Sequence, residues 1–229
     1  MLDSLTLSES QKASLGEAAA RYHENVNDLG SYLEGRGIDR AAAVGHLLGK
    51  VSEPAHGHER FEGWMSIPYL TLSGVVAFKF RCLEDHDHKA LGHGKYDAPA
   101  GQKIRLYNAR MCAEKGDTIA IVEGELDSIV GSSVLDVPTV GTWGTNWMEW
   151  YPRCFADFDR ILVIADNDHP KPLPAREGKA PEMVSPGRKF AEKVRKEVNG
   201  ELVLPPAGMD LSEWVAQDGA DVVRKAMGL

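Results

Sequence analysis

The 229-residue chain is poor in cysteine, and its three cysteines are scattered. Cys82, Cys112 and Cys154 are odd in number and form no CxxC pair. A disulfide framework or a zinc ribbon would need paired cysteines at short, regular spacings. We therefore expect a protein of a reducing cytosol, and we expect no zinc in this chain.

Long apolar runs are also missing. No stretch approaches the length that a membrane-spanning helix requires, and residues 1–6 lack the basic-then-apolar pattern of a secretory signal. These absences favour a cytoplasmic protein without a membrane partner. Hydrophobic residues make up 43% of the sequence, which is enough for a real core, so the chain fits one large domain or two small ones.

The sequence also lacks an excess of positive charge. The formal net charge is −8, which at first argues against a nucleic-acid partner. The distribution is uneven, however. Residues 117–229 hold 19 Asp and Glu against 12 Lys and Arg, a net of −7, whereas residues 31–115 hold 10 against 12, a net of +2. An acidic half beside a mildly basic half suits a metal enzyme that binds a phosphate backbone with its other part.

The first half of the chain predicts helices followed by one hairpin. We expect a helix over residues 3–30, stopped by Gly30, and further helical stretches over residues 31–33 and 39–48, the latter capped by Asp39. The apolar pattern then predicts a hairpin of Met65–Leu70 with Val75–Cys82. Residues 84–103 are polar and glycine-rich, which is typical of an exposed loop.

From about residue 117 the pattern alternates between strand and helix. We expect strands at 118–122, 137–140, 160–165 and 201–204, and helices at 125–134, 147–155, 186–198 and 211–217. This alternation is typical of a Rossmann-like parallel sheet with helices on both faces. We therefore expect an α/β protein with a helical extension at 1–30, a smaller α+β nucleic-acid-binding subdomain at 31–115 and a catalytic domain at 116–229.

Carboxylates follow three of the predicted strands or their connections. Glu123 and Asp127 come after the first strand, Asp166 and Asp168 after the third, and Asp210 after the last. Parallel strands bring these ends to one edge, where several carboxylates repel one another unless a cation bridges them. Oxygen ligands favour Mg²⁺ or Mn²⁺. The sequence therefore predicts a divalent-metal site for phosphate chemistry.

The strand-EGxxD, strand-DxD and late Pro-x-Gly-x-Asp motifs together resemble the Toprim domain of primases, topoisomerases and related nucleases. The resemblance is closest to the catalytic core of bacterial-type, DnaG-like DNA primases and covers residues 31 to about 218. Its further segments are Tyr32-Leu33-x-x-Arg36-Gly37-Ile38, Ile67-Pro68, Gly74 to Arg81, Lys95-Tyr96, Leu106-Tyr107 and Gly141-Thr142 to Thr145.

The resemblance implies template-directed synthesis of short RNA primers from NTPs on single-stranded DNA, with two or more Mg²⁺ or Mn²⁺ ions. It implies that Asp166, Asp168 and Asp210 are metal ligands, that Glu123 is a ligand or general base, and that Asp127 orients them. It also implies that nucleotide phosphates and template are bound by Arg36, Arg81, Lys95, Lys103, Arg105, Gly141, Thr142 and Thr145. The expected partners are a replicative helicase and a separately encoded zinc-binding module, and the expected source is a phage or plasmid in a bacterial cell.

The chain departs from the family at two places. Ser212 stands where the family has a second acidic residue after Asp210, so one metal position is weakened or served by Glu213. The segment between Asp168 and Pro186 is longer than the family's tight turn and is rich in proline and lysine.

Other interpretations stay open from the residues alone. A Toprim nuclease or RNA-maturation enzyme would use the same carboxylates to cleave, and a non-catalytic nucleic-acid-binding subunit would be consistent with Ser212. His86, Asp87, His88 and His93 favour a solvated loop over a zinc site, because they lie in a polar, glycine-rich segment. Trp147 and Trp150, three apart on the predicted helix, favour core packing over base stacking.

Overall fold

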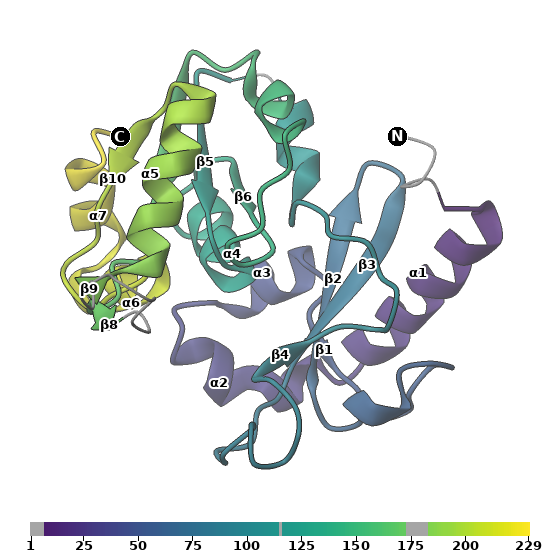
Figure 1. The fold of residues 1–229 in the computed structure, drawn as a ribbon. Helices are drawn as coiled ribbons and strands as arrows, with labels where there is room; N and C mark the ends of the chain where they lie inside the picture. Colours follow the sequence, from purple (N-terminus) through teal and green to yellow (C-terminus); the bar gives the residue numbers. More distant parts are fainter. Residues whose placement is uncertain (1–6, 115, 173–182) are drawn as a thin grey trace, which may run out of the picture. The chain divides into compact units, whose positions relative to one another are not determined.

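The computed structural model describes residues 7–114, 116–172 and 183–229. The chain divides into two compact units, the first ending at Arg110 and the second beginning at Met111 (Figure 1). The expected boundary was at residues 115 and 116. The described residues of the expected extension at 1–30 belong to the first unit.

The first unit begins with a series of short helices, which corrects the prediction of one helix over residues 3–30. Helix α1 spans Glu9–His23, a 3₁₀ turn spans Val26–Leu29, and α2 and α3 span Gly30–Glu34 and Arg40–Gly45. The chain tightens after α1 because Val26 and Leu29 turn into the core. Gly30 has ordinary helical dihedral angles and starts α2 instead of stopping a helix. Residues 3–6 of the prediction lie outside the described residues.

Side-chain caps stabilise the amino termini of α1 and α3. The Ser8 hydroxyl accepts a hydrogen bond from the Gln11 N–H, and the Gln11 side chain accepts one from the Ser8 N–H, which forms a capping box. Asp39 Oδ1 accepts a hydrogen bond from the Ala42 N–H at 2.7 Å, so the predicted N-cap of α3 is confirmed.

An antiparallel sheet in the order β1-β2-β3-β4 completes the first unit. Its strands are Gly49–Lys50, Met65–Thr71, Gly74–Arg81 and Tyr96–Asp97, and a 3₁₀ turn spans Glu59–Phe61. The predicted hairpin is β2 with β3. The polar segment 84–103 is not all loop, because β4 pairs with β3 through Arg81 and Tyr96.

Helix α1 packs on this sheet through Ala18, Ala19 and Tyr22, which join Phe78 and Phe80 of β3 in a buried aromatic cluster. A methyl group on Gly49 would lie 2.2 Å from the Tyr22 carbonyl oxygen. The helix backbone therefore approaches β1 so closely that only glycine fits there.

The second unit contains the predicted parallel sheet, in the order β10-β7-β5-β6. Its strands are β5 (Thr118–Val122), β6 (Thr139–Gly141), β7 (Arg160–Ile164) and β10 (Glu201–Val203). The helices are α4 (Glu125–Ser133), α5 (Pro186–Val198), α6 (Leu211–Asp218) and α7 (Ala220–Ala226), with a 3₁₀ turn at Tyr151–Phe155. A further 3₁₀ turn, Ala109–Ala113, spans the boundary between the two units. A small hairpin pairs β8 (Lys171–Pro172) with β9 (Met183–Val184).

The connections of this sheet reverse direction between β5 and β7. From β5 the chain passes through α4 to β6 on one side, and from β7 it passes through α5 to β10 on the other. Right-handed crossovers in opposite directions put α4 and α5 on opposite faces of the sheet (Figure 1). Ligands of open α/β sheets bind at the carboxyl ends of strands where this direction reverses.

The predicted helix at 147–155 is wrong. The described chain forms only the 3₁₀ turn Tyr151–Phe155, because Pro152 lacks an N–H and its ring would clash with the preceding turn of a longer helix. Trp147 and Trp150 precede the turn and are partly exposed. Both rings nevertheless pack on the buried Tyr151, and Trp147 also stacks on the buried Phe155, so the packing interpretation is confirmed although the helix is not. The Trp147 indole donates a hydrogen bond to Glu197 at 2.8 Å.

Among the described residues, no helix combines the length and the apolar character that crossing a bilayer requires.

The first unit should lose stability in acid through His46. The side chain is 3% exposed and hydrogen-bonds Tyr107 at 2.9 Å. Burial, and then the nearby Arg110 charge, lower its pKa to about 4. Since the unfolded chain binds this proton near pH 6.5, stability from this group is complete above that pH and falls as pH drops towards 4.

We expect His46→Asn to remove about 2 kcal/mol of the stability difference between pH 8 and pH 5, measured by urea unfolding. His56→Asn, whose side chain is fully exposed, serves as the matched control. Equal pH dependence in the parent and His46→Asn would contradict the interpretation.

Candidate metal centre

Asp166 lies at the centre of a group of carboxylates after β7. Its pKa is raised to about 9, first by burial and then by the charges of Asp127, Glu123, Asp210 and Asp168, in that order. These residues come from the β5–α4 turn, the first turn of α4, the segment after β7 and the start of α6. The structure therefore brings together the acidic residues that the sequence places after separate strands.

This arrangement fits a divalent cation. With a pKa near 9, the Asp166 carboxyl keeps its proton at neutral pH when no cation is present, and a bound cation would displace that proton. The donors are oxygen atoms, and Glu123 Oε2 is shielded from solvent within the group. Mg²⁺ and Mn²⁺ prefer such ligands.

Asp127 lies in the first turn of α4 and packs against the turn that joins β5 to this helix. Gly124 is the extended residue before α4, and a methyl group there would lie 2.8 Å from Asp127 Oδ2. Glycine thus leaves room for the carboxylate beside the backbone. Asp127 is 5% exposed, which argues against a solvated first-turn carboxylate.

Ser212 connects Asp127 with Asp210. Its N–H donates to Asp127 Oδ1 at 2.9 Å, and its hydroxyl donates to Asp210 Oδ1 at 2.8 Å. Ser212 is 1% exposed, so it organises two carboxylates from within the group. The neighbouring Glu213 is exposed, and its carboxylate accepts a hydrogen bond from the Asp210 N–H in a capping box at the start of α6.

Asn167, which the sequence analysis missed, joins the segment after β7 to the segment before α6. Its N–H donates to the Met209 carbonyl at 3.0 Å, and its carbonyl accepts from the Gly208 N–H at 2.7 Å. Its side-chain amide donates to the Pro205 carbonyl at 2.7 Å. Asn167 therefore sets the position of Asp210 relative to Asp166. In the sequence, the asparagine between the two aspartates of Asp166-Asn167-Asp168 was the feature that could have identified this residue.

The start of α5 packs directly against Asp166. A methyl group on Gly187 would lie 2.8 Å from Asp166 Cβ and 2.6 Å from its carbonyl oxygen. A helix amino terminus carries partial positive charge, which favours a nearby carboxylate. Asp168, in contrast, has a side chain that is 55% exposed and lies 3.7 Å from the Lys171 ammonium, so it is the outermost member of the group.

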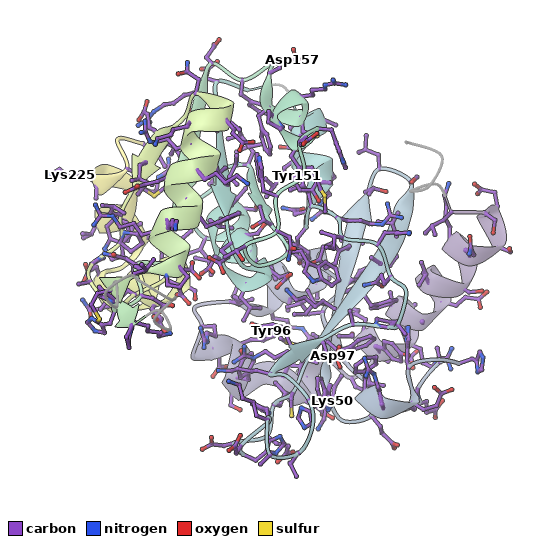
Figure 2. The ribbon with its side chains drawn as sticks, in the orientation of Figure 1. Lys50, Tyr96, Asp97, Tyr151, Asp157 and Lys225 are labelled. Carbon is purple, nitrogen blue, oxygen red and sulfur yellow. The ribbon has the colours of Figure 1, made fainter. Side chains whose placement is uncertain are left out.

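The candidate basic residues of the first unit fall into separate groups. The Arg81 guanidinium is 5% exposed and lies over the rings of Tyr32 and Tyr96, at 4.9 and 4.8 Å from their centres (Tyr96 is labelled in Figure 2). Arg36 acts electrostatically on the same Tyr32. Lys95 is exposed and follows the histidine-containing loop.

Lys103 and Arg105 lie in a different groove of the first unit. They line it together with residues of α1, including Ser10, Gln11 and Ser14. This groove offers cationic and hydroxyl groups side by side, which suits phosphate oxygens. The structure thus does not gather all five predicted basic residues in one place.

Thr142 forms hydrogen bonds that hold the loop after β6 in shape. Thr142 is fully buried, its N–H donates to the Val122 carbonyl, and its hydroxyl donates to the Gly144 carbonyl at 2.6 Å. These groups shape the loop that begins at Gly141 and are not available to a phosphate. Thr145 is exposed and lines a groove with α5.

Three lysines that the sequence analysis missed line the groove beside Thr145. Lys189, Lys193 and Lys196 lie on one side of α5. Their spacing of four and three residues is that of a single helix face and could have been read from the sequence. Glu192 and Glu197 line the same groove, and Glu197 lies 3.9 Å from the Lys193 ammonium, so the positive charge there is partly neutralised.

Replacing Asp166 should stabilise the cation-free protein and abolish its response to metal. Asp166→Asn removes the carboxyl whose ionisation is opposed by burial and by four neighbours. We expect a gain of at least about 1 kcal/mol at pH 7.5, by urea unfolding, since one pKa unit corresponds to about 1.4 kcal/mol. Mn²⁺ should raise the melting temperature of the parent and not of the variant.

Asp157→Asn is the matched control, because Asp157 is exposed and precedes β7 at the opposite end of the strand (Figure 2). A variant Asp166→Asn that is less stable than the parent, or that keeps the full response to Mn²⁺, would refute the metal-centre assignment.

Asn167→Ala should weaken cation binding without removing a carboxylate. Loss of the amide bond to Pro205 frees the Asp210 segment, and residues that orient metal ligands commonly change affinity about 10- to 100-fold. We expect a loss in this range in a Mn²⁺ titration by calorimetry. Asn25→Ala, which removes an amide bond to Ser52 in the first unit, should leave the affinity unchanged. Unchanged affinity in Asn167→Ala would show that the bond does not position Asp210.

Comparison with known proteins identifies the fold. No family model matches the chain. The Gene 57 protein of Mycobacterium phage D29 is 29% identical over 170 residues, which cover 71% of this chain and 97% of the phage protein.

Solved structures match more of the chain. The RNA polymerase domain of Mycobacterium tuberculosis primase DnaG has a TM-score of 0.72 at 20% identity, over 96% of this chain and 84% of that one. A DnaG primase catalytic domain bound to single-stranded DNA has a TM-score of 0.67 at 15% identity, over 96% and 82%. The chain therefore has the fold of the DnaG primase catalytic core, as the sequence motifs predicted.

Proposed function

We propose that this protein is a DNA primase core that synthesises short RNA primers from NTPs on single-stranded DNA. The observation that carries the proposal is the convergence of Glu123, Asp127, Asp166 and Asp210 at the carboxyl ends of β5 and β7 in a primase-like fold. A nucleotide brings a phosphate chain and its cations to such a group of oxygen donors. The likeness to primase catalytic domains supports the same reaction class.

In this reaction a ribonucleotide 3′-hydroxyl attacks the α-phosphate of an incoming NTP, and pyrophosphate leaves. Bound Mg²⁺ or Mn²⁺ would lower the pKa of the attacking hydroxyl and neutralise the leaving phosphates. Asp166, Asp210 and Glu123 would hold the cations, with Asp168 at the outer edge. Glu123 has a second possible role as the base that accepts the hydroxyl proton.

Positioning of these ligands would fall to side chains that do not themselves hold the ion. Ser212 links Asp127 to Asp210, and Asn167 fixes the segment that carries Asp210. In this proposal Asp127 is an orienting residue, because one of its oxygens already accepts the Ser212 N–H. Ser212 therefore compensates for the acidic residue that the family has at this position.

Nucleic acid would be held by cationic surfaces of each unit. Lys103 and Arg105 in the first unit, and Lys189, Lys193 and Lys196 in the second, line grooves that suit a phosphate backbone. Arg36, Arg81 and Lys95 remain predicted contacts. The solved catalytic domain with bound single-stranded DNA supports a template of this kind.

The finer biological setting also remains a prediction. We expect a phage-encoded protein acting in the cytoplasm of a bacterial cell, which the phage relative supports. A replicative helicase and a separately encoded zinc-binding module are its predicted partners.

Primer synthesis on single-stranded DNA, followed with a labelled NTP and Mn²⁺, tests the proposal. We expect RNA products from the parent protein and from Asp157→Asn. Asp166→Asn should lose activity on the order of 100-fold or more, because it removes the central cation ligand.

The same reactions without NTPs test the rival function. Metal-dependent nicking of the DNA, with no RNA product when NTPs are present, would identify a Toprim nuclease instead. Binding of single-stranded DNA with neither reaction would identify a non-catalytic subunit.

A further inference from the structure

A second group of metal-binding side chains lies in the first unit. Cys82, His86, His88 and His93 each offer one donor atom, and these four atoms all lie within 4.8 Å of one another. The three histidine rings have centres 4.5 to 5.3 Å apart. From the sequence, the histidines favour a solvated loop, because they lie in a polar, glycine-rich segment and Cys82 belongs to the preceding predicted strand.

The spacing of these atoms fits a tetrahedral zinc ion. With Zn–S near 2.3 Å and Zn–N near 2.05 Å, a tetrahedral angle separates sulfur from nitrogen by about 3.6 Å. The separation of Cys82 Sγ and His86 Nε2 is 3.6 Å. One thiolate and three imidazoles are ligands that favour Zn²⁺ over Mg²⁺ or Ca²⁺.

Two further atoms point to a ligand at this place. His88 Nδ1 is itself shielded from solvent, although the residue is partly exposed, and it has no hydrogen-bond partner among the described residues. A buried ring nitrogen without a partner is costly unless something binds it. His93 Nδ1 lies 3.0 Å from the Gly94 carbonyl, so it carries the proton and leaves the lone pair on Nε2. Such a backbone bond commonly orients a metal-ligating histidine.

Hydrogen bonds within the loop itself hold these four side chains together. Asp87 Oδ1 accepts hydrogen bonds from the Lys89 and Ala90 N–H groups, which starts a turn. The His93 N–H then donates to the His88 carbonyl at 3.0 Å. Gly92, just before His93, has the positive φ that glycine adopts readily. The Cys82 N–H donates to the Lys95 carbonyl, which closes the loop at the end of β3.

We propose that Cys82, His86, His88 and His93 form a structural Zn²⁺ site. Four protein ligands leave no open position, which is typical of structural and not catalytic zinc. On binding, the Cys82 thiol gives its proton to solvent and the sulfur bonds to the ion as thiolate, while the imidazoles bind in their neutral form. The ion would fix a long loop that is mostly exposed, and would hold Lys95 beside Arg81 at the end of β3.

Metal analysis of the untagged full-length protein tests this site. After dialysis against metal-free buffer, we expect one tightly bound zinc per chain by inductively coupled plasma mass spectrometry. His88→Ala and Cys82→Ser should lose most of it. His56→Ala, an exposed histidine of the same unit, and Asp166→Asn in the second unit should keep it.

Cobalt substitution of the parent protein reports the coordination geometry of the site directly. We expect the absorption of tetrahedral Co²⁺ together with a thiolate-to-cobalt charge-transfer band. The band should disappear in Cys82→Ser. The first-unit variants His88→Ala, Cys82→Ser and His56→Ala are compared only if they retain the Mn²⁺-dependent rise in melting temperature, which reports an intact second unit.

Three results would overturn the proposal. They are a parent protein without stoichiometric zinc, a zinc content in His88→Ala and Cys82→Ser equal to that of the parent, and an octahedral cobalt spectrum. None of them bears on primer synthesis, so failure of the zinc site and failure of the primase proposal are distinguishable.

Discussion

Electrostatic repulsion among buried carboxylates is the constraint around which the second unit is built. Asp166 sits where burial and four acidic neighbours all oppose its ionisation. The fold tolerates this because donors are fixed around the group: the Ser212 N–H and hydroxyl, and the Asn167 amide that locks two loops together. A site with so much unfavourable charge is stable only with a proton or a cation in it.

Much of this arrangement could be predicted from sequence because it follows from periodic signals. Apolar runs such as Thr118–Val122, separated by helical segments, predict a parallel sheet, and the sheet order then puts Glu123 and Asp166 at the adjacent carboxyl ends of β5 and β7. Helix boundaries were less predictable, since Pro152 outweighs the apolar pattern of residues 147–155 and buried Val26 and Leu29 end the first helix early.

The contacts that organise the site could not be predicted, because they join positions that no local pattern relates. Ser212 looked like a defect from its identity alone, and only its distances to Asp127 and Asp210 show what it does. Thr142 resembled a phosphate contact, although its polar groups are used within the loop. Cys82 belongs to a strand by its pattern and to the histidine group only by its position in space.

The contact between Gly187 and Asp166 has a consequence for how such proteins diversify. The chain that leaves β7 must return to the same point before α5, whatever path it takes, because no side chain fits between them. A change in the length of the connection between β7 and α5 therefore leaves Asp166 in place only if it preserves this close approach.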